Sequence, residues 1–462
     1  MNIDNKSITQ LGTMPIRQLL MQYAVPAIIA MTASSLYNMV DSVFIGQGVG
    51  ALAISGLALT FPLMNLAAAF GSLVGMGAST LISLRFGQRD YATAQNILGN
   101  VIVLNTIIGT LFGLVCLIFL DPILYFFGAS EFTIGYARDY MQIILLGNVI
   151  SHMFMGLNAI LRAAGHPKRS MAATINTVVI NTILDPIFIY GFHWGIRGAA
   201  IATIVSQAIS LSWQIYLFSD KRELLHLKRG IYRIQSKIVK NIFAIGMSPF
   251  LMNCAACLIV IFINKGLKGY GGDLSVGAYG IVNRICFIFV MIVMGLNQGM
   301  QPIAGYNYGA KEYGRVKRVL KLTLIAATIV TTIGFLVGEL FPQVAVRAFT
   351  SDEQLISIAV TGMRITLAVF PIVGMQIVTS NFFQSIGMAN RAIFLSLSRQ
   401  LIFLLPGLIF LPIIFSNYTS IDGSWGVWMS MPISDLLASC LAFVLLRKQL
   451  KIFGEQQKLT KE

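Results

Sequence analysis

The chain has 462 residues, of which 56% are hydrophobic and only 11% are charged, and its formal net charge is +15. This composition excludes an ordinary soluble domain, in which about a quarter of the residues are charged, and it indicates a chain that crosses a bilayer repeatedly. The positive charge does not indicate nucleic acid, because most Lys and Arg residues lie in alternate loops and not along one stripe, so no nucleic-acid partner is expected.

About 20 apolar residues cross a hydrocarbon core, and the sequence contains twelve such segments. Backbone groups that face lipid must be satisfied within their own segment, so each segment is predicted to be an α-helix and the fold to be all-α. The N-terminus shows no short apolar core followed by a small-residue cleavage site, so no secretory leader is expected. The predicted spans begin near residues 18, 53, 96, 137, 171, 197, 239, 275, 318, 357, 391 and 424.

The charges of the loops predict how the chain is oriented. Basic residues fill 166–170, 219–240 and 309–321 as well as both chain ends, whereas 121–133 and 350–354 are acidic or neutral. Loops rich in Lys and Arg remain in the cytoplasm. Both termini are therefore expected to be cytoplasmic, in a multi-pass protein of the plasma (inner) membrane.

An internal repeat divides the chain. "FGQRDYATA" (86–94) and "YGAKEYGRV" (308–316) share aromatic-Gly-x-basic-acidic-Tyr, so that Phe86 matches Tyr308. This repeat predicts two six-helix bundles, 1–225 and 241–462, joined by a basic cytoplasmic linker at 226–240. An even number of spans in each half gives both halves the same orientation, so they are expected to be related by a pseudo-twofold axis along the membrane normal.

The first span contains a carboxylate, Asp41, within "LYNMVDSVFIG" (36–46). An ionisable group inside a membrane helix costs roughly 2.5 to 3.5 kcal/mol, so it is expected to face a cavity or a partner. The fifth span offers that partner, because Asn181 and Asp185 are four residues apart and share one helix face. Ala199 and Thr203 share a face of the sixth span in the same way.

The depths of these groups agree. At about 1.5 Å of rise per residue, Asp41, Asp185 and Thr203 all lie roughly 8 to 10 Å inside the outer ends of their spans. The second half contains no comparable pair of acids. The chemistry is therefore predicted to belong to the N-terminal bundle.

The two halves, the proline of the first span, Asp41 and the run "GLNQGMQPIAGYNYGA" (295–310) resemble the multidrug and toxic compound extrusion (MATE) transporters. The resemblance covers nearly the whole chain. The acid of the first span, together with the Asn and Asp of the fifth, is similar to the prokaryotic DinF-like and MepA-like branch. It implies drug efflux driven by H⁺ or Na⁺ through a V-shaped pair of bundles with a central cavity, by alternating access.

The resemblance also implies roles for individual residues. The coupling cation would bind at Asp41, Asn181, Asp185, Ala199 and Thr203. Two carboxylates in a low-dielectric pocket cannot both remain ionised without a cation, and Na⁺ could be held by the oxygens of Asp41, Asn181, Asp185 and Thr203. A structural role, in which these groups only hydrogen-bond across helices, is the alternative.

Pro26 weakens the first span, because a proline removes a backbone hydrogen bond, and the resemblance makes it a gating hinge; a static kink is the alternative. Substrate is expected near Tyr37, Asn158 and Gln207. Amphipathic, mostly cationic drugs would be the cargo, lipids the surroundings, and a monomer the working unit. No cofactor besides the coupling ion is expected.

Four further charges fall within C-terminal spans: Arg284, Arg364, Arg399 and Asp435. Arg284 or Arg399 could pair with Asp435, or could extend toward the interface. The glycines of "GSLVG" (71–75) and "GLNQG" (295–299) are expected to permit close helix approach.

An enzyme is not expected, because the sequence lacks a Walker lysine loop, HExxH and GxSxG. The alternatives to an antiporter are a lipid or lipid-linked oligosaccharide flippase of the same architecture, a channel and a purely structural membrane protein. A flippase would need several cationic groups for a pyrophosphate, and the N-terminal bundle offers acids instead.

Overall fold

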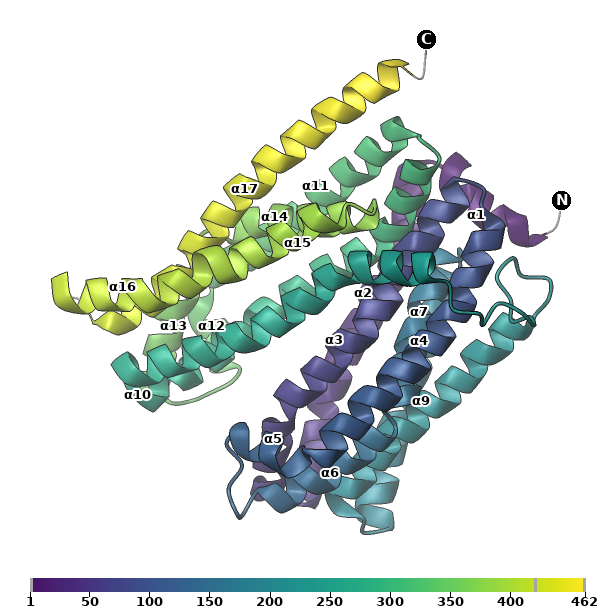
Figure 1. The fold of residues 1–462 in the computed structure, drawn as a ribbon. Coiled ribbons are helices and arrows are strands. Elements are labelled where there is room, and N and C mark those ends of the chain that lie inside the picture. The colour runs from purple at the N-terminus through teal and green to yellow at the C-terminus, as the bar shows by residue number, and fades with distance from the viewer. Residues whose placement is uncertain (1–2, 419–421, 460–462) are drawn as a thin grey trace.

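The computed structural model describes residues 3–418 and 422–459, which are almost entirely helical. In Figure 1 the helices form two bundles that meet at the end carrying both termini and diverge away from it. The prediction of an all-α protein is confirmed. The V-shaped arrangement that the resemblance implies is also present.

The N-terminal bundle follows a short helix, α1 (Ile3–Thr13). Its helices are α2 (Ile16–Gly48), α3 (Ala51–Gly87), α4 (Tyr91–Ile118), α5 (Leu120–Phe126), α6 (Ile134–Leu146), α7 (Asn148–Ala163), α8 (Pro167–Pro186), the π-helix η1 (Ile187–Gly191) and α9 (Gly195–Ser219). The C-terminal bundle contains α10 (Ser236–Gly309), α11 (Tyr313–Leu340), α12 (Pro342–Arg347), α13 (Glu353–Leu367), α14 (Phe370–Ser385), α15 (Ala389–Leu397), the π-helix η2 (Ser398–Leu404), α16 (Leu405–Tyr418) and α17 (Gly423–Leu459).

Nine helices in the described part of the chain are long and apolar enough to cross a membrane, and two bent pairs, α6 with α7 and α13 with α14, raise that number to eleven. The longest helix, α10, has 74 residues and is interrupted at Gly272, whose φ of 71° lies in the left-handed region. Gly50, which separates α2 from α3, is the repeat counterpart of Gly272 and also has a positive φ, 118°. Since α10 corresponds to α2 and α3 together, its two arms match two of the predicted spans.

Packing shows that α10 folds back on itself. A Cβ at Gly246 would lie 1.8 Å from the carbonyl oxygen of Leu73, and one at Gly309 would lie 2.2 Å from that of Leu84. A straight helix would separate Gly246 from Gly309 by about 95 Å. Both contacts are with α3, so the two arms of α10 lie beside the same helix.

The repeat is visible in matched contacts across the seam between the bundles. A Cβ at Gly87 would lie 1.9 Å from the carbonyl oxygen of Tyr306, and the contact of Gly309 with Leu84 is its counterpart, because each residue of one contact matches a residue of the other in the repeat. Only glycine permits backbones to approach this closely. The closed end of the molecule is therefore a two-fold related crossing of α3 with α10.

The glycines of the runs 71–75 and 295–299 permit close helix approach, as the sequence predicts. A Cβ at Gly75 would lie 3.2 Å from the Cα of Gly156, which brings α3 close to α7. At Gly299 a Cβ would lie 2.5 Å from the Cα of Ala24, on α2. The second contact lies beside Pro26.

At the end where the bundles meet, a helical segment of each half packs within the core of the other. Leu19, Leu20 and Tyr23 of α2 belong to a core cluster with residues of the C-terminal half. Ile242 and Ile245 of α10 pack in turn within the N-terminal cluster. The first turns of each of these helices therefore pack against the other bundle.

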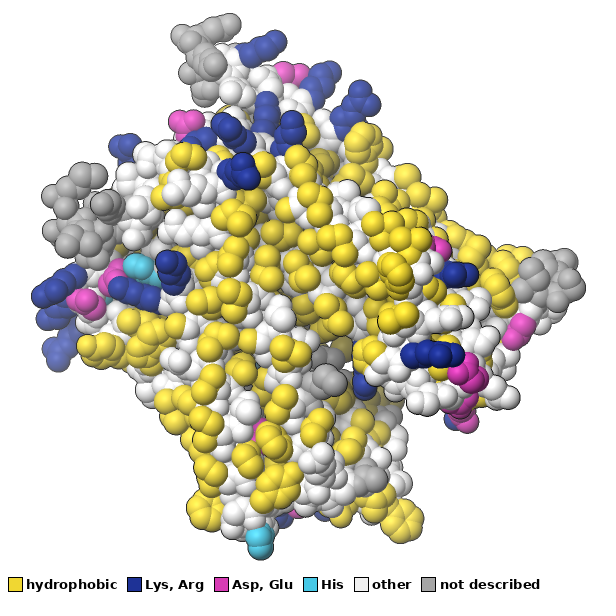
Figure 2. All heavy atoms as spheres, turned by 180° about the vertical axis from the view of Figure 1, so that it is seen from behind, with side chains coloured by type: hydrophobic (Ala, Val, Ile, Leu, Met, Phe, Trp, Pro, Cys, Tyr) yellow, Lys and Arg dark blue, Asp and Glu magenta, His cyan; other side chains and the backbone are white. Residues whose placement is uncertain are grey.

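The surface carries the expected band of apolar side chains. Figure 2 shows Lys and Arg gathered near the end where the bundles meet, above a broad apolar zone. Many large apolar residues are exposed, including Ile118 at 73% and Leu111 at 61%. Exposure on this scale is unusual for a soluble surface and suits contact with lipid.

The segment that joins the two bundles overlaps the predicted linker, 226–240. Residues 220–235 lie between α9 and α10, and α10 begins at Ser236, within the segment 226–240 that the basic charges indicated. Ser236–Lys240 is helical because its apolar side, Ile238 with Ile242, packs into the N-terminal core. Charge alone does not report that packing.

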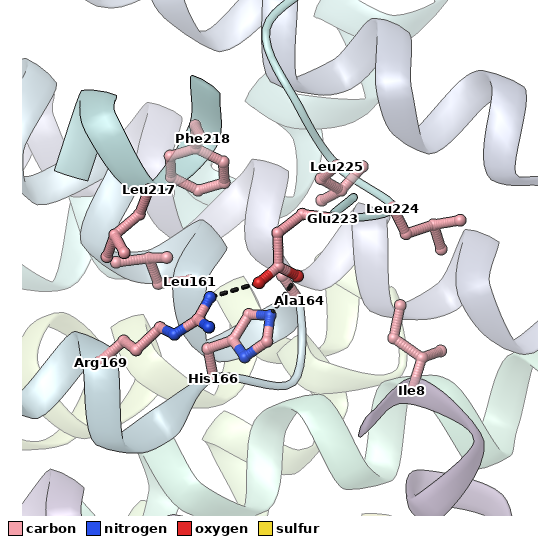
Figure 3. A pocket seen from close by; sticks show the side chains of 10 residues that line it. All are labelled: Ile8, Leu161, Ala164, His166, Arg169, Leu217, Phe218, Glu223, Leu224 and Leu225. Carbon is pink, nitrogen blue, oxygen red and sulfur yellow. Dashed lines mark hydrogen bonds and ion pairs between the residues drawn. The ribbon is translucent and has the colours of Figure 1, made fainter. Parts of the chain in front are cut away.

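The linker is held firmly against the N-terminal bundle. Glu223 accepts hydrogen bonds from His166, at 2.8 Å, and from Arg169, and Figure 3 shows the three side chains converging. The hydrogen bond from His166, followed by that from Arg169, holds the pKa of Glu223 at about 2. Asn100 donates to the carbonyl of Arg233, at 3.2 Å, which fixes the later part of the linker.

Candidate cation and substrate site

Two carboxyl groups face each other inside the N-terminal bundle. Asp41 lies on α2 and Asp185 at the end of α8, and their side chains are within hydrogen-bonding reach of one another. Asp41 is 5% exposed and Asp185 is fully buried. The chain places Asp185 directly before Pro186 and the π-helix η1, where the regular hydrogen-bond pattern of α8 ends.

Amide and hydroxyl groups surround the pair. Both atoms of the Asn181 amide are satisfied when its nitrogen donates to Oδ2 of Asp185, at 3.0 Å, and its oxygen accepts from the backbone N–H of Thr203, at 3.1 Å. The hydroxyl of Thr203 donates to the carbonyl oxygen of Ala199, at 3.1 Å. The five residues predicted to form the cation site therefore lie together, with Ala199 contributing its backbone.

Two tyrosines complete the cluster. The Tyr37 hydroxyl lies 3.2 Å from that of Thr203. Tyr140, on α6 and 1% exposed, also reaches the Thr203 hydroxyl. Sequence reasoning missed Tyr140. With the fourth span beginning at 137 the residue would be too shallow, whereas α6 begins at Ile134 and puts it about 9 Å deep, level with Asp41.

This cluster fits a small hard cation or a proton. Oδ1 of Asp41 is buried and has no hydrogen-bond partner among the described residues, and an unsatisfied buried carboxylate oxygen is costly. Carboxylate, amide and hydroxyl oxygens are the ligands that hard cations prefer. The pair can equally share one proton, because neighbouring carboxyl groups in a low-dielectric site do not both ionise.

The remaining predicted substrate residues lie elsewhere in the bundle. Asn158 is buried between α7 and α8, where its nitrogen donates to Thr174, at 3.0 Å, and its oxygen accepts from Arg162, at 3.0 Å. Gln207 accepts a hydrogen bond from Ser151. Only Tyr37 of the three belongs to the acidic cluster, so contact of Asn158 and Gln207 with substrate stays a prediction.

Pro26 lies where α2 passes between the bundles. The helix continues through it, so the structure contains a proline within an unbroken span. A Cβ at Gly295 would lie 2.7 Å from the Cα of Ile28, and Gly299 contacts Ala24. The proline is therefore flanked on both sides by close contacts with α10.

Of the other intramembrane charges, Arg399 pairs with Asp435, its Nε lying 2.6 Å from Oδ1. Arg284 and Arg364 are exposed. The sequence left open whether Arg284 or Arg399 pairs with Asp435, and the structure shows that the partner is Arg399. Both members of the observed pair lie in the C-terminal bundle.

Two helical bundles with an extensive apolar surface and a buried acidic cluster define a polytopic membrane transporter. The family model MatE matches residues 26–187 and 245–409. These segments make up more than half of the chain, which therefore belongs to the MATE family of transporters. The resemblance recognised in the sequence is confirmed.

Known relatives match along nearly the whole chain. The multidrug export protein MepA of Staphylococcus haemolyticus (strain JCSC1435) is 28% identical over 426 residues, 92% of each chain. MepA of Staphylococcus aureus (strain N315) is 27% identical over 441 residues, 95% of this chain and 96% of its own. The chain is similar to these two proteins but differs from each at about seven aligned positions in ten.

Solved structures agree with the fold. A MATE multidrug transporter, DinF-BH, solved as a complex, is 35% identical, with a TM-score of 0.87 over 96% of this chain and 98% of its own. An outward-facing multidrug resistance MATE transporter of the MOP superfamily, 24% identical, has a TM-score of 0.89 over the same shares. At that identity the second comparison concerns the fold alone.

Proposed function

We propose that the protein is a cation-coupled antiporter that exports amphipathic, mostly cationic compounds by alternating access. The observation that carries this proposal is the buried pair Asp41 and Asp185 with an unsatisfied carboxylate oxygen. The printed names of the relatives, which are multidrug export proteins, support the substrate class. H⁺, Na⁺ or both would serve as the coupling ion.

The position of α2 suggests how the ion would act. Its first half packs with the C-terminal core at Leu19 and Tyr23, and its second half carries Asp41 to the acidic cluster. A shift of Asp41 upon binding or release of a cation would be transmitted along one helix to the seam. Pro26, which removes one backbone hydrogen bond, is the point at which that helix bends most easily.

Orientation and assembly are part of the same proposal. The basic end of the molecule would face the cytoplasm of the cell and hold both termini, in the plasma membrane. The V would then be open to the outside. We further propose that the monomer is sufficient, because both the acidic cluster and the seam are built from one chain.

The test is efflux of ethidium from proteoliposomes or inverted vesicles in which the pH gradient and the Na⁺ gradient are imposed separately. Asp41→Asn is expected to abolish gradient-driven transport, a loss of at least about 100-fold if the ion has no other site. Asp139→Asn serves as the control, because Asp139 pairs with Arg197 on an exposed surface.

Transport that persists unchanged in Asp41→Asn would contradict the cation site. An absence of transport in the unsubstituted protein under both gradients would favour a lipid flippase, which the same vesicles can test with a fluorescent lipid. Gradient-independent, non-saturating flux would indicate a channel.

A further inference from the structure

The C-terminal bundle contains a cavity that the acidic cluster does not use. Its volume is about 390 Å³, within the range of sites for drug-sized ligands. Both arms of α10 line it, together with α14, η2 and α17. Most of its wall is apolar, and Met252, Met291 and Met294 give that wall adaptable side chains.

One wall of the cavity is formed by the Arg399–Asp435 ion pair. Only Nε of Arg399 is engaged, with Oδ1 of Asp435 at 2.6 Å. In the described part of the chain neither of its Nη atoms makes a hydrogen bond. The Arg399 side chain remains 32% exposed whereas that of Asp435 is only 7% exposed. The guanidinium therefore presents unused donors to the cavity.

Amide groups also line this cavity. Oε1 of Gln400 is buried without a partner among the described residues, and Gln400 itself is only 8% exposed. Asn253 and Asn381 donate their amide hydrogens to the carbonyls of Pro249 and Ile377, each at 2.9 Å. The cavity thus combines charged donors at one point with acceptors nearby.

The cavity extends to the seam between the bundles. Met294 and Asn381 also line a smaller pocket that Met76 of α3 closes from the other bundle. Asn297 and Gln384 lie there with buried amide atoms that have no partner within the described ranges. The cavity that Arg399 lines therefore reaches the seam between the bundles at Met294 and Asn381.

We propose that this cavity is a second ligand site, in which the free Nη donors of Arg399 bind the carboxylate of zwitterionic or anionic amphipathic compounds while Nε keeps its ion pair with Asp435. An Arg guanidinium pairs with a carboxylate through two parallel hydrogen bonds, and the free Nη donors permit that geometry. The apolar wall receives the body of the ligand. The proposal rests on the proposed function in one respect, which is that the compound bound in this cavity would also be exported.

The experiment uses two fluorescent probes that share one rhodamine scaffold. The first carries an ethyl ester, and the second, its hydrolysis product, carries a free carboxylate at the same place. Their affinities for the purified full-length protein in detergent are measured by fluorescence anisotropy. The variants are Arg399→Gln and the charge-balanced Arg399→Gln/Asp435→Asn, and the control is Arg364→Gln, which removes an exposed arginine from the same bundle.

The acid is expected to bind about tenfold more weakly, or worse, to both Arg399 variants, because each loses a charge-assisted hydrogen bond, while the ester changes by less than about twofold. Asp435→Asn alone should tighten the acid, since the negative charge beside Arg399 is gone. Arg364→Gln should bind both probes as the unsubstituted protein does. A purely structural role of Arg399 would not separate the acid from the ester.

Equal weakening of acid and ester, or unchanged binding of the acid in both Arg399 variants, would overturn the proposal. Melting curves of every variant in the same detergent ensure that binding is compared among folded proteins, and the charge-balanced variant avoids an unpaired buried Asp435. Failure of the proposed function is a separate result, the absence of gradient-driven ethidium efflux. Neither finding depends on the other.

Discussion

The two bundles share one fold but differ in their buried charges. In the N-terminal bundle Asp41 and Asp185 face each other with no basic partner among the described residues, whereas in the C-terminal bundle Asp435 is neutralised by Arg399. In the register of the repeat, the positions that match Asp41 and Asp185 are held by Ile263 and Gly407. The glycines that bring helices together recur in both halves, whereas these buried acids do not.

This difference shows what each kind of residue is required for. Packing glycines recur in both halves because the helices must cross at the same distance in each. A buried acid is costly to retain unless it is used or paired. The acids of the first bundle therefore carry the proposal of ion coupling, whereas the buried acid of the second is neutralised within its own bundle.

The largest difference between the bundles is expected when one buried acid is removed from each of them in turn. Asp185→Asn is expected to reduce ion-driven efflux of ethidium by about 100-fold, since it leaves a single carboxylate that cannot hold the ion. Asp435→Asn is expected to reduce it far less, by no more than about fivefold, because Asp435 lines the ligand cavity and does not face the coupling ion. Efflux from proteoliposomes measures both. A similar loss in the two variants would show that the bundles are not specialised as proposed.

The seam gives the next largest effect. Gly87→Ala and Gly309→Ala should each destabilise the protein by about 2 to 3 kcal/mol, because each added Cβ meets a backbone carbonyl of the other bundle. Gly135→Ala is the control, since no neighbouring atom of the described residues lies within 4 Å of its Cβ position. Thermal unfolding in detergent measures the loss. If only one of the two substitutions lowered the stability, the two matched contacts would not contribute equally to the seam.

Tyr140→Phe should have a moderate effect. Loss of a hydroxyl near Thr203 is expected to weaken coupling-ion affinity about three- to tenfold, the size of one hydrogen bond, without unfolding the protein. The ion concentration that drives half-maximal efflux measures this. Tyr125→Phe is the control, because Tyr125 is 50% exposed. The matching position in the C-terminal bundle is Gly362, so that bundle offers no equivalent hydroxyl.

The smallest effect concerns the linker clamp. Arg169 binds the carboxylate of Glu223, whereas its repeat counterpart Arg391 binds the neutral Gln449. The pKa of Glu223 is lowered from 4.5 to about 2, so its contribution is complete above pH 4.5 and declines as the pH falls toward 2. Glu223→Gln should cost about 1 to 2 kcal/mol at pH 7.

Thermal unfolding of the two forms at pH 7 and pH 4 tests this prediction. The difference between them should shrink at the lower pH, because part of the contribution of Glu223 is then lost in the unsubstituted protein as well. Gln449→Glu would reproduce the pH dependence in the C-terminal half. A pH-independent difference would mean that the Glu223 carboxylate is not the source of the stabilisation.

The sequence by itself determined the helices, the repeat and the acidic cluster. Apolar runs must be helical in lipid, so the spans could be placed within a few residues, and the spacing of Asn181 and Asp185 fixed their shared face. Depth along a helix depends on rise per residue alone, which is why Asp41, Asp185 and Thr203 could be put at one level. Tyr140 was not considered, because a tyrosine in an apolar span carries no charge that marks it as a site residue.

Only the tertiary structure decided which helices meet. The exchange of α2 and α10 between bundles, the choice of Arg399 over Arg284 as the partner of Asp435, and the cavity beside that pair depend on how helices rotate and cross. Side chains on several helices contribute to each of these features, and no local pattern reports their relative rotation. The periodicity of a sequence predicts which face of a helix is buried. Only the tertiary structure shows which other helix packs against that face.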